Sequence, residues 1–166
     1  MEPSERITAC IPRLRRYARA LVGDRAAADD LIQDTLERAW SKFSQFRDGS
    51  DLRAWLFSIM HNEHINQIRK RRDTMSFDDD AHDVSVPATQ SDGLEIRDLD
   101  RALQTLPVEQ REVLLLIVIE EMSYEQVSVA LGIPTGTVMS RLSRARERVR
   151  AYMSGTPLIT RLQVVK

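Results

Sequence analysis

The sequence of 166 residues contains a single cysteine, Cys10, so no intramolecular disulfide bond can form. This absence favours a reducing compartment, which we expect to be the cytoplasm. Cys10 itself is interpreted as a buried structural residue rather than a reactive thiol. The amino-terminal residues lack the apolar core and cleavage site of a signal peptide. The longest strongly apolar run, Val113–Ile119, is too short to span a membrane, so we expect no membrane insertion.

The patterns of common enzyme sites are missing as well. The sequence has no alternating strand-helix-strand pattern, no glycine-rich phosphate loop and no set of residues with metal-ligand spacing. His61 and His64 are three positions apart but lack an evident third ligand, so we interpret them as surface or DNA-facing side chains. The sequence therefore predicts no catalytic residue, no cofactor and no metal centre.

What the sequence does contain is a strong charge pattern beneath a formal net charge of −1. Residues 1–72 carry 14 basic and 10 acidic residues, a net charge of +4. Residues 73–98 carry one basic and eight acidic residues, a net charge of −7, and residues 99–166 return to +2. Two basic blocks that flank an acidic segment indicate two modules and a tether.

The first block is predicted to hold three helices. Helical spacing of apolar residues runs from about Ser4 to Val22, then from an N-cap at Asp24 to about Phe43. A third helix should begin near Asp51 and end in the basic cluster that closes with Arg72. Residues 73–97 are rich in Asp, Ser, Thr and Gly without sustained periodicity, which predicts a mostly disordered linker.

The second block is predicted to be helical from about Asp98. Pro107 suits the first turn of a helix that continues through the run VLLLIVI, which could form a strand alone but has no visible partner strand. Ser123 and Gln126 have the spacing of a capping box, and Gly132 is placed to end the short helix that the box opens. The fold class is therefore all-α, with two small helical modules joined by an acidic flexible linker.

A helix from about Thr135 follows that turn, so the segment predicts a helix-turn-helix. One side of this helix carries an apolar stripe for packing: Val138, Leu142, Ala145, Val149 and Tyr152. A neighbouring face carries arginines, whose guanidinium groups can bind phosphate or pair with guanine. Basic residues alone would indicate only a solvated face, but together with the turn and the stripe they favour contact with DNA.

Two features of the first block have open interpretations. The second helix carries an acidic face formed by Asp30, Gln33, Asp34 and Glu37, which is either solvated surface or a docking site for a basic partner. On the third helix, the stripe of Trp55 and Ile59 continues into Asn62 and Asn66. Their amides either contact exposed bases near the following basic cluster or are capped or buried within the module.

Three stretches carry a resemblance to a known family: AADDLIQDTLERAW, DLRAWLFSIMHNEHINQIRKRR, and the segment from LPVEQREVLLL to RARERVR. They resemble an extracytoplasmic-function (ECF) sigma factor of bacterial RNA polymerase, in the right order and over nearly all of residues 7–152 outside the linker. The resemblance implies a transcription initiation factor that binds core RNA polymerase and directs it to promoter DNA. It also implies control by an anti-sigma factor and no enzyme activity.

The resemblance assigns roles along the chain. It implies a sigma region 2 module over residues 1–72, the acidic linker over 73–97 and a sigma region 4 module over 98–153, with no role for the tail 154–166. Docking on the polymerase is implied for Asp30, Gln33, Asp34 and Glu37. Melting and capture of the minus-ten element is implied for Asn62, Asn66, Arg69, Lys70, Arg71 and Arg72. Reading of the minus-thirty-five element is implied for Ser140, Arg141, Arg144, Arg146 and Arg148.

One position departs from the family, because Met139 stands where a basic residue is common. A thioether cannot bind phosphate strongly or pair with guanine, so one DNA contact is expected to be missing or to read a thymine methyl group instead. Three other functions compete with the resemblance. They are a stand-alone regulator of duplex DNA, a DNA-acting enzyme such as a recombinase, and an adaptor built only of helices.

Overall fold

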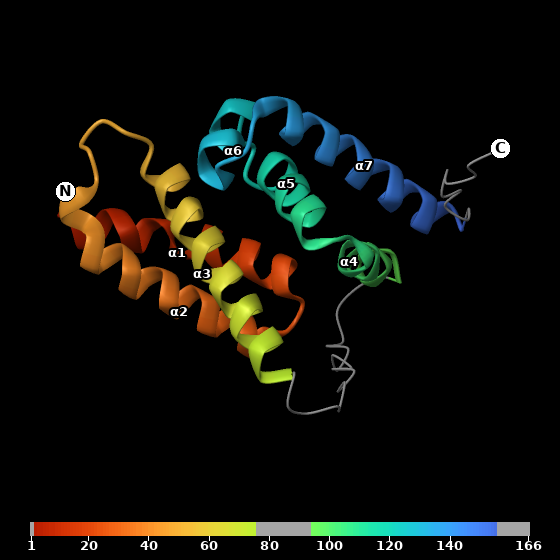
Figure 1. Cartoon of the computed structure of the whole chain (residues 1–166), viewed down its shortest axis with the longest axis horizontal. Coiled ribbons are helices and arrows are strands. Elements are labelled where there is room, and N and C mark those ends of the chain that lie inside the picture. Colours follow the sequence, from red (N-terminus) through yellow and green to blue (C-terminus); the bar gives the residue numbers. More distant parts are fainter. Residues whose placement is uncertain (1, 76–93, 156–166) are drawn as a thin grey trace.

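The computed structural model describes residues 2–75 and 94–155, which contain helices and no strand. The predicted all-α fold with two helical groups is thereby confirmed (Figure 1). The first group comprises α1 (Pro3–Val22), α2 (Arg25–Lys42), the short 3-10 helix η1 (Phe43–Gln45) and α3 (Leu52–Met75). The second group comprises α4 (Leu94–Thr105), α5 (Val108–Val118), α6 (Tyr124–Leu131) and α7 (Thr135–Ser154).

The first group is a three-helix unit with a shared apolar core. Leu14 of α1, Leu31 of α2 and Phe57 of α3 are buried in it, and the rings of Tyr17 and Phe57 meet edge to face at 4.9 Å. The predicted N-cap Asp24 accepts a hydrogen bond from the backbone N–H of Ala27, at 3.2 Å. These contacts fix how α2 presents its outer face to solvent.

The second group contains the predicted helix-turn-helix. Ser123 and Gln126 form the capping box at the start of α6, and Gly132 ends that helix with a φ of +66°, which favours glycine. Helix α7 then begins at Thr135 as predicted, and Val138, Leu142 and Ala145 of its apolar stripe are buried. The stripe fades toward the end of the helix, because Val149 is only partly buried and Tyr152 is 43% exposed.

The apolar run VLLLIVI lies within and just after α5, at the centre of the second group. Residues 111–116 are all buried, because α5 contacts α7 on one side and α1 of the first group on another. A helix that is buried on most sides needs apolar residues around its whole circumference, which gives it a strand-like sequence. The choice of helix over strand for this run is confirmed.

Both ends of the predicted linker are helical. Helix α3 continues to Met75, and α4 begins at Leu94, so the prediction of disorder over residues 73–97 is wrong for the first three and last four residues. Thr74 supports the added turn of α3 by donating from its hydroxyl to the backbone oxygen of Lys70, at 2.7 Å. The remaining linker residues, with the acidic run 78–80, lie outside the described residues, as does most of the tail.

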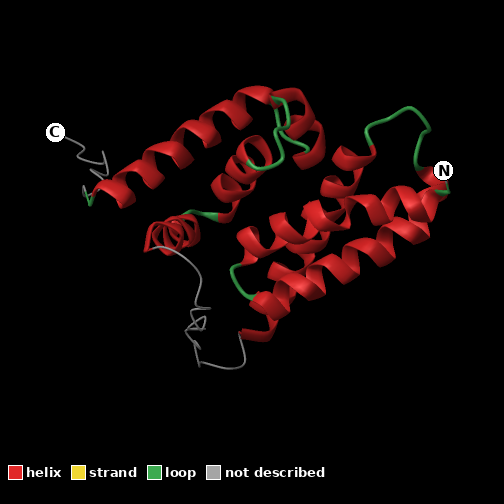
Figure 2. Cartoon of the chain, turned by 180° about the vertical axis from the view of Figure 1, so that it is seen from behind, coloured by secondary structure: helices red, strands yellow, loops and turns green. Residues whose placement is uncertain are grey.

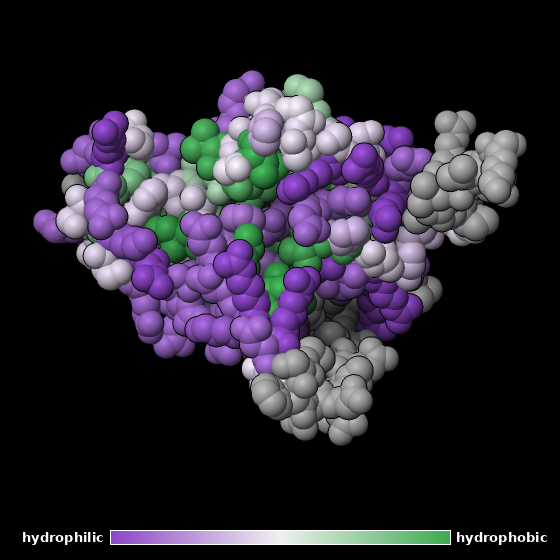
Figure 3. Space-filling view, in the orientation of Figure 1, coloured by the Kyte–Doolittle hydropathy of each residue, from purple (hydrophilic) through white to green (hydrophobic). Residues whose placement is uncertain are grey.

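The two helical groups pack directly against each other (Figures 1 and 2). Helix α3 lies on α6, and α1 lies on α4 and α5; we call these contacts the junction. The charge pattern indicated two tethered modules but gave no sign of this contact. Figure 3 shows apolar side chains at the centre of this face, along the junction, within a surface that is otherwise largely hydrophilic.

Candidate nucleic-acid interface

Helix α7 presents the predicted DNA-contacting residues unequally. Arg144 and Arg146 are exposed, and Ser140 is exposed with its hydroxyl donating to the backbone oxygen of Thr137. Arg141 and Arg148 are only partly exposed. Because the apolar stripe fixes the rotation of α7, Arg144 and Arg146 are held outward, where a duplex could reach them without repacking. Met139, the departure from the family pattern, is 48% exposed beside them.

Arg141 lines a cavity of about 500 Å³ at the junction together with Arg69 and Arg72 of α3. None of the three guanidinium groups forms an ion pair with another described residue. Glu109 and Glu112 of α5 also line the cavity, so its charge is mixed. The stretches assigned to two separate promoter elements therefore lie beside each other in this arrangement.

Asn62 and Asn66 are both exposed, and neither amide makes a hydrogen bond to another described residue. The alternative that these asparagines are buried or serve as structural caps is therefore wrong. Ile59, one turn earlier on the same stripe, is buried, so α3 changes from a core-forming to a solvent-facing surface along this line. Such free amides are available to hydrogen-bond base edges.

The neighbouring histidines do not lie on the surface. His64 is buried and His61 is half-buried, and the Nδ1 of His61 lies 2.9 Å from the Glu112 carboxylate, against 3.7 Å for His64. Our interpretation of both residues as surface or DNA-facing is wrong, because Glu112 of α5 lies against this side of α3. Within residues 2–75 and 94–155, no group of three or more histidine, cysteine, aspartate or glutamate side chains could hold a metal ion.

The acidic face of α2 is exposed to solvent except at Asp34. Asp30, Gln33 and Glu37 are exposed, with the Gln33 amide donating to the Glu37 carboxylate at 3.3 Å. Asp34 differs, because it is partly buried and accepts a hydrogen bond from Gln67 of α3 at 2.9 Å. Asp34 thus also joins two helices of the first module, which makes it a poor choice for a surface test.

Cys10 is half-buried against the core of the first module, as interpreted from the sequence. Burial raises the pKa of its thiol, although Arg13 acts in the opposite direction. The thiol is therefore less reactive than a free cysteine. In the part of the chain that the structure describes, no helix is long and apolar enough to cross a membrane.

The residues that sequence reasoning missed are three buried charges of the second module: Arg111, Glu112 and Glu120. The Arg111 guanidinium donates to four backbone oxygens, those of Leu103, Gln104 and Leu106 at 2.8, 3.1 and 2.8 Å and that of Leu21 at 2.6 Å. The last of these belongs to α1, so Arg111 crosses the junction. Burial lowers the pKa of Arg111, with Asp100 and Glu112 acting against the shift.

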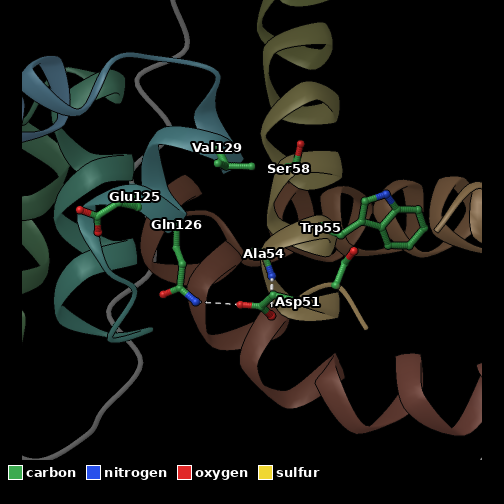
Figure 4. A pocket seen from close by; sticks show the side chains of 8 residues that line it. Asp51, Ala54, Trp55, Ser58, Glu125, Gln126 and Val129 are labelled. Carbon is green, nitrogen blue, oxygen red and sulfur yellow. Dashed lines mark hydrogen bonds between the residues drawn. The ribbon is translucent and has the colours of Figure 1, made fainter. Parts of the chain in front are cut away.

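A further polar bridge lies at the edge of a cavity of about 400 Å³ between α3 and α6 (Figure 4). One Asp51 carboxylate oxygen accepts from the backbone N–H of Ala54, at the start of α3, and the other accepts from the Gln126 amide, at 2.8 Å. Gln126 is also the second member of the α6 capping box. The predicted cap of one module is thus hydrogen-bonded to the start of a helix in the other.

Glu112 is expected to make the stability of the chain sensitive to acid. Burial acts to raise the pKa of this carboxyl, but the hydrogen-bonded His61 and the adjacent His64 outweigh burial and hold the pKa below its ordinary value. A lowered carboxyl pKa contributes stability that is complete above the unfolded value of about 4.3. That contribution is lost as the pH falls from there through the folded pKa. Urea unfolding from pH 6 to pH 3 measures it.

We expect Glu112→Gln to be less stable than wild type at pH 6, and the difference to shrink as the pH falls below about 4. The control is Glu125→Gln, an exposed carboxyl on the same module, which should follow the wild-type curve at every pH. A stability difference between Glu112→Gln and wild type that stays constant over this range would contradict the prediction.

Comparison with known proteins matches both modules to sigma-type domains. The family model described as "Sigma2 domain of PhyR" matches residues 7–61, and that described as "Sigma-70, region 4" matches residues 96–149. The chain is 38% identical to the ECF RNA polymerase sigma factor EcfG of Rhodopseudomonas palustris, over 89% of this chain and 82% of that protein. It is 30% identical to the ECF RNA polymerase sigma factor SigM of Bacillus subtilis, over 82% of this chain and 85% of that protein.

Two solved structures resemble the fold. One is the sigma factor RpoE in complex with the anti-sigma factor NepR from Bartonella quintana, with 37% identity, a TM-score of 0.82, and coverage of 91% of this chain and 96% of that one. The other is CnrH in complex with the cytosolic domain of CnrY, with 26% identity, a TM-score of 0.69, and coverage of 93% and 88%.

Proposed function

Because this chain belongs to the ECF sigma factors of bacterial RNA polymerase, we propose that it divides promoter recognition between its two modules. Residues 1–72, as sigma region 2, dock on core polymerase and melt the minus-ten element. Residues 98–153, as sigma region 4, read the minus-thirty-five element in duplex DNA. The chain acts by binding alone in the cytoplasm and catalyses no reaction of its own.

The observation that carries this proposal is that each module has a solvent-facing charged surface, and the two surfaces are opposite in charge. Helix α2 offers exposed carboxylates without burying them against another helix, which suits a basic protein partner. Helix α7 offers exposed guanidinium groups beside a buried stripe, which suits a duplex. A stand-alone regulator would need only the arginine surface of α7. In such a regulator, the exposed Asn62 and Asn66 would have no binding partner.

The direct test is transcription with purified components. The chain is mixed with core polymerase and genomic DNA, and the 5′ ends of the transcripts are sequenced. We expect new start sites that share two upstream elements and that are absent with core polymerase alone. Failure to bind core polymerase, with binding to duplex DNA intact, would favour the stand-alone regulator instead.

Reversing the charge of the acidic face should weaken polymerase binding. We expect Asp30→Lys with Glu37→Lys to lower the affinity for core polymerase by about 10-fold or more, because oppositely charged surfaces would become like-charged. The affinity is measured by fluorescence anisotropy at two salt concentrations. The matched control is Asp48→Lys with Glu121→Lys, an equal charge change at exposed loop residues. Equal affinities for the two double variants would show that the acidic face of α2 does not contact the polymerase.

Arg144 is the best-placed reader of the upstream element, since it is exposed and lies one turn after Ser140. Loss of a bidentate contact to guanine should cost about 1–3 kcal/mol and relax the preference at one base pair. A randomised promoter library, transcribed with Arg144→Ala, measures this change. A uniform loss of transcription over all promoters would indicate that Arg144 contacts a phosphate. No loss would indicate that Arg144 does not contact the promoter.

We also propose control of this chain by an anti-sigma factor. The support is its similarity to the sigma factor RpoE, which is bound to the anti-sigma factor NepR in the solved structure. The similarity extends over 91% of this chain, so both modules have counterparts in that sigma factor.

A further inference from the structure

The buried charges of the described residues gather at the junction. The buried basic and acidic side chains are His64, Arg111, Glu112 and Glu120, and each lies in or beside a contact between α1 or α3 and the second module. Burial of a charge is costly unless it is paired. A contact between modules that was fortuitous would leave these groups in water, so their placement indicates a specific arrangement.

Glu120 is the most deeply buried of the four. Its side chain is fully buried, and its carboxylate oxygens lie 3.3 Å from Arg16 and 3.7 Å from Arg13, both on α1. Its backbone oxygen accepts a hydrogen bond from Arg53 of α3 at 2.8 Å. Both arginines that pair with the Glu120 carboxylate therefore belong to the first module, whereas Glu120 belongs to the second.

The contact with the arginines is specific but not strongly stabilising. Desolvation of a buried carboxylate offsets most of the attraction that its partners provide. The two arginine side chains stay 52% and 58% exposed, and Oε2 of Glu120 makes no hydrogen bond. If the arginines are lost, however, the carboxylate remains buried without a partner, which is strongly unfavourable. The junction can thus be opened by a change confined to α1.

The closed arrangement is incompatible with simultaneous contact to two promoter elements. Elements about 25 base pairs apart lie about 85 Å from each other along B-form DNA. In the structure, Arg141 of α7 lines the same cavity as Arg69 and Arg72 of α3, so the two assigned stretches are adjacent. Binding to a promoter on the polymerase therefore requires the modules to separate.

We propose that Glu120 with Arg13 and Arg16 is a charge-dependent latch: while the carboxylate is paired the modules stay closed and cannot engage both promoter elements, and loss of the pairing leaves a buried carboxylate that drives them apart. The acidic face of α2 stays exposed in this arrangement, so docking on the polymerase can precede release. The consequence for transcription rests on the proposed function, whereas the latch itself is a property of the chain alone.

The test measures the distance between the modules in solution. Spin labels are placed at Ala26→Cys and Ser143→Cys, two exposed positions on α2 and α7, in a Cys10→Ala background. We expect one narrow, short distance distribution for the otherwise unchanged chain. Arg13→Ala with Arg16→Ala should raise the ratio of open to closed molecules by about 10- to 100-fold, a range that allows for partial hydration of the freed carboxylate.

Two further variants make the result specific. Arg15→Ala with Arg19→Ala removes two exposed arginines from the same helix, on the side that lines a cavity with α2, and should leave the modules closed. Adding Glu120→Gln to the Arg13→Ala, Arg16→Ala variant removes the unpaired charge and should restore closure. An open distribution without any substitution, an unchanged distribution in the double variant, or a failure of Glu120→Gln to restore closure would each overturn the latch.

The functional arm uses the unlabelled chains with core polymerase and promoter DNA. The opened variant should assemble with an apparent Kd that is lower by up to the same factor, because less of the chain is held in a form that cannot bind. Unchanged assembly by a chain shown to be open would overturn the inhibitory role. If the distances change as expected but wild type directs no transcription, the latch stands and the proposed function fails. The reverse pattern would retain the proposed function and reject the latch.

Discussion

Replacing Arg111 with methionine should lower the free energy of unfolding by about 3–5 kcal/mol. Methionine approximates the length of the aliphatic part but donates no hydrogen bond. The four backbone oxygens that Arg111 serves would lose their donor, and those of Leu21 and Leu106 are bonded in buried surroundings. Each buried acceptor left without a partner costs about 1–3 kcal/mol, and local rearrangement recovers part of that.

Urea unfolding followed by circular dichroism at 222 nm measures the loss. The matched control is Arg101→Met on α4, an exposed arginine whose described ion pair, with Asp98, is stretched to 4.0 Å between exposed side chains. That variant should change the free energy of unfolding by less than about 0.5 kcal/mol. Equal stabilities of the two variants would show that the four hydrogen bonds contribute nothing to folding.

The second large effect is expected from Asn62→Ala with Asn66→Ala, and it concerns promoter opening. Captured bases stay flipped out only if new contacts offset a few kcal/mol of lost pairing and stacking. Because both amides are exposed and unbonded to other described residues, their loss should spare the fold. We expect closed complexes to form normally and the rate of opening to fall by about 10- to 100-fold, since each of the two lost amide hydrogen bonds is worth about 0.5–1.5 kcal/mol.

Permanganate reactivity of melted thymines reports opening, and a gel shift reports the closed complex. A promoter mismatched across the minus-ten element should recover much of the loss, because its unpairing cost has already been removed. The exposed amide Gln45 in η1, replaced by alanine, serves as the control. If the double variant opened matched promoters like wild type, the asparagines would have no role in strand capture.

Local sequence signals were sufficient to predict the helices and most of their ends, apart from the ends of α3 and α4 that adjoin the linker. Asp24, the Ser123–Gln126 capping box and Gly132 act through neighbours within a few residues, so their chemistry can be read without knowing the fold. The predicted stripe of α7 follows from helical periodicity in the same way. The assignment of DNA and polymerase contacts came from the resemblance, and it stays a prediction for each residue.

The junction could not be predicted, for a physical reason. Glu120 and Arg16 are 104 positions apart, and His61 and Glu112 are 51 apart, and no periodicity links such pairs. Arg111 and Glu112 directly precede an apolar run, so they resemble the polar start of an ordinary helix. The histidines were misinterpreted for the same reason, because their burial depends on a helix from the other module.

The buried charges that the second module contributes to the junction, Arg111, Glu112 and Glu120, all lie between positions 111 and 120, along α5 and the turn that follows it. This clustering has a consequence for chimeric proteins. A graft that exchanges everything after the linker replaces these contacts as a set, whereas one that exchanges only α6 and α7 alters DNA reading and keeps them. A crossover at Met122 therefore exchanges the proposed DNA-reading helices and keeps the buried charges, although it also replaces the contacts of α6 with α3, among them the Gln126–Asp51 hydrogen bond.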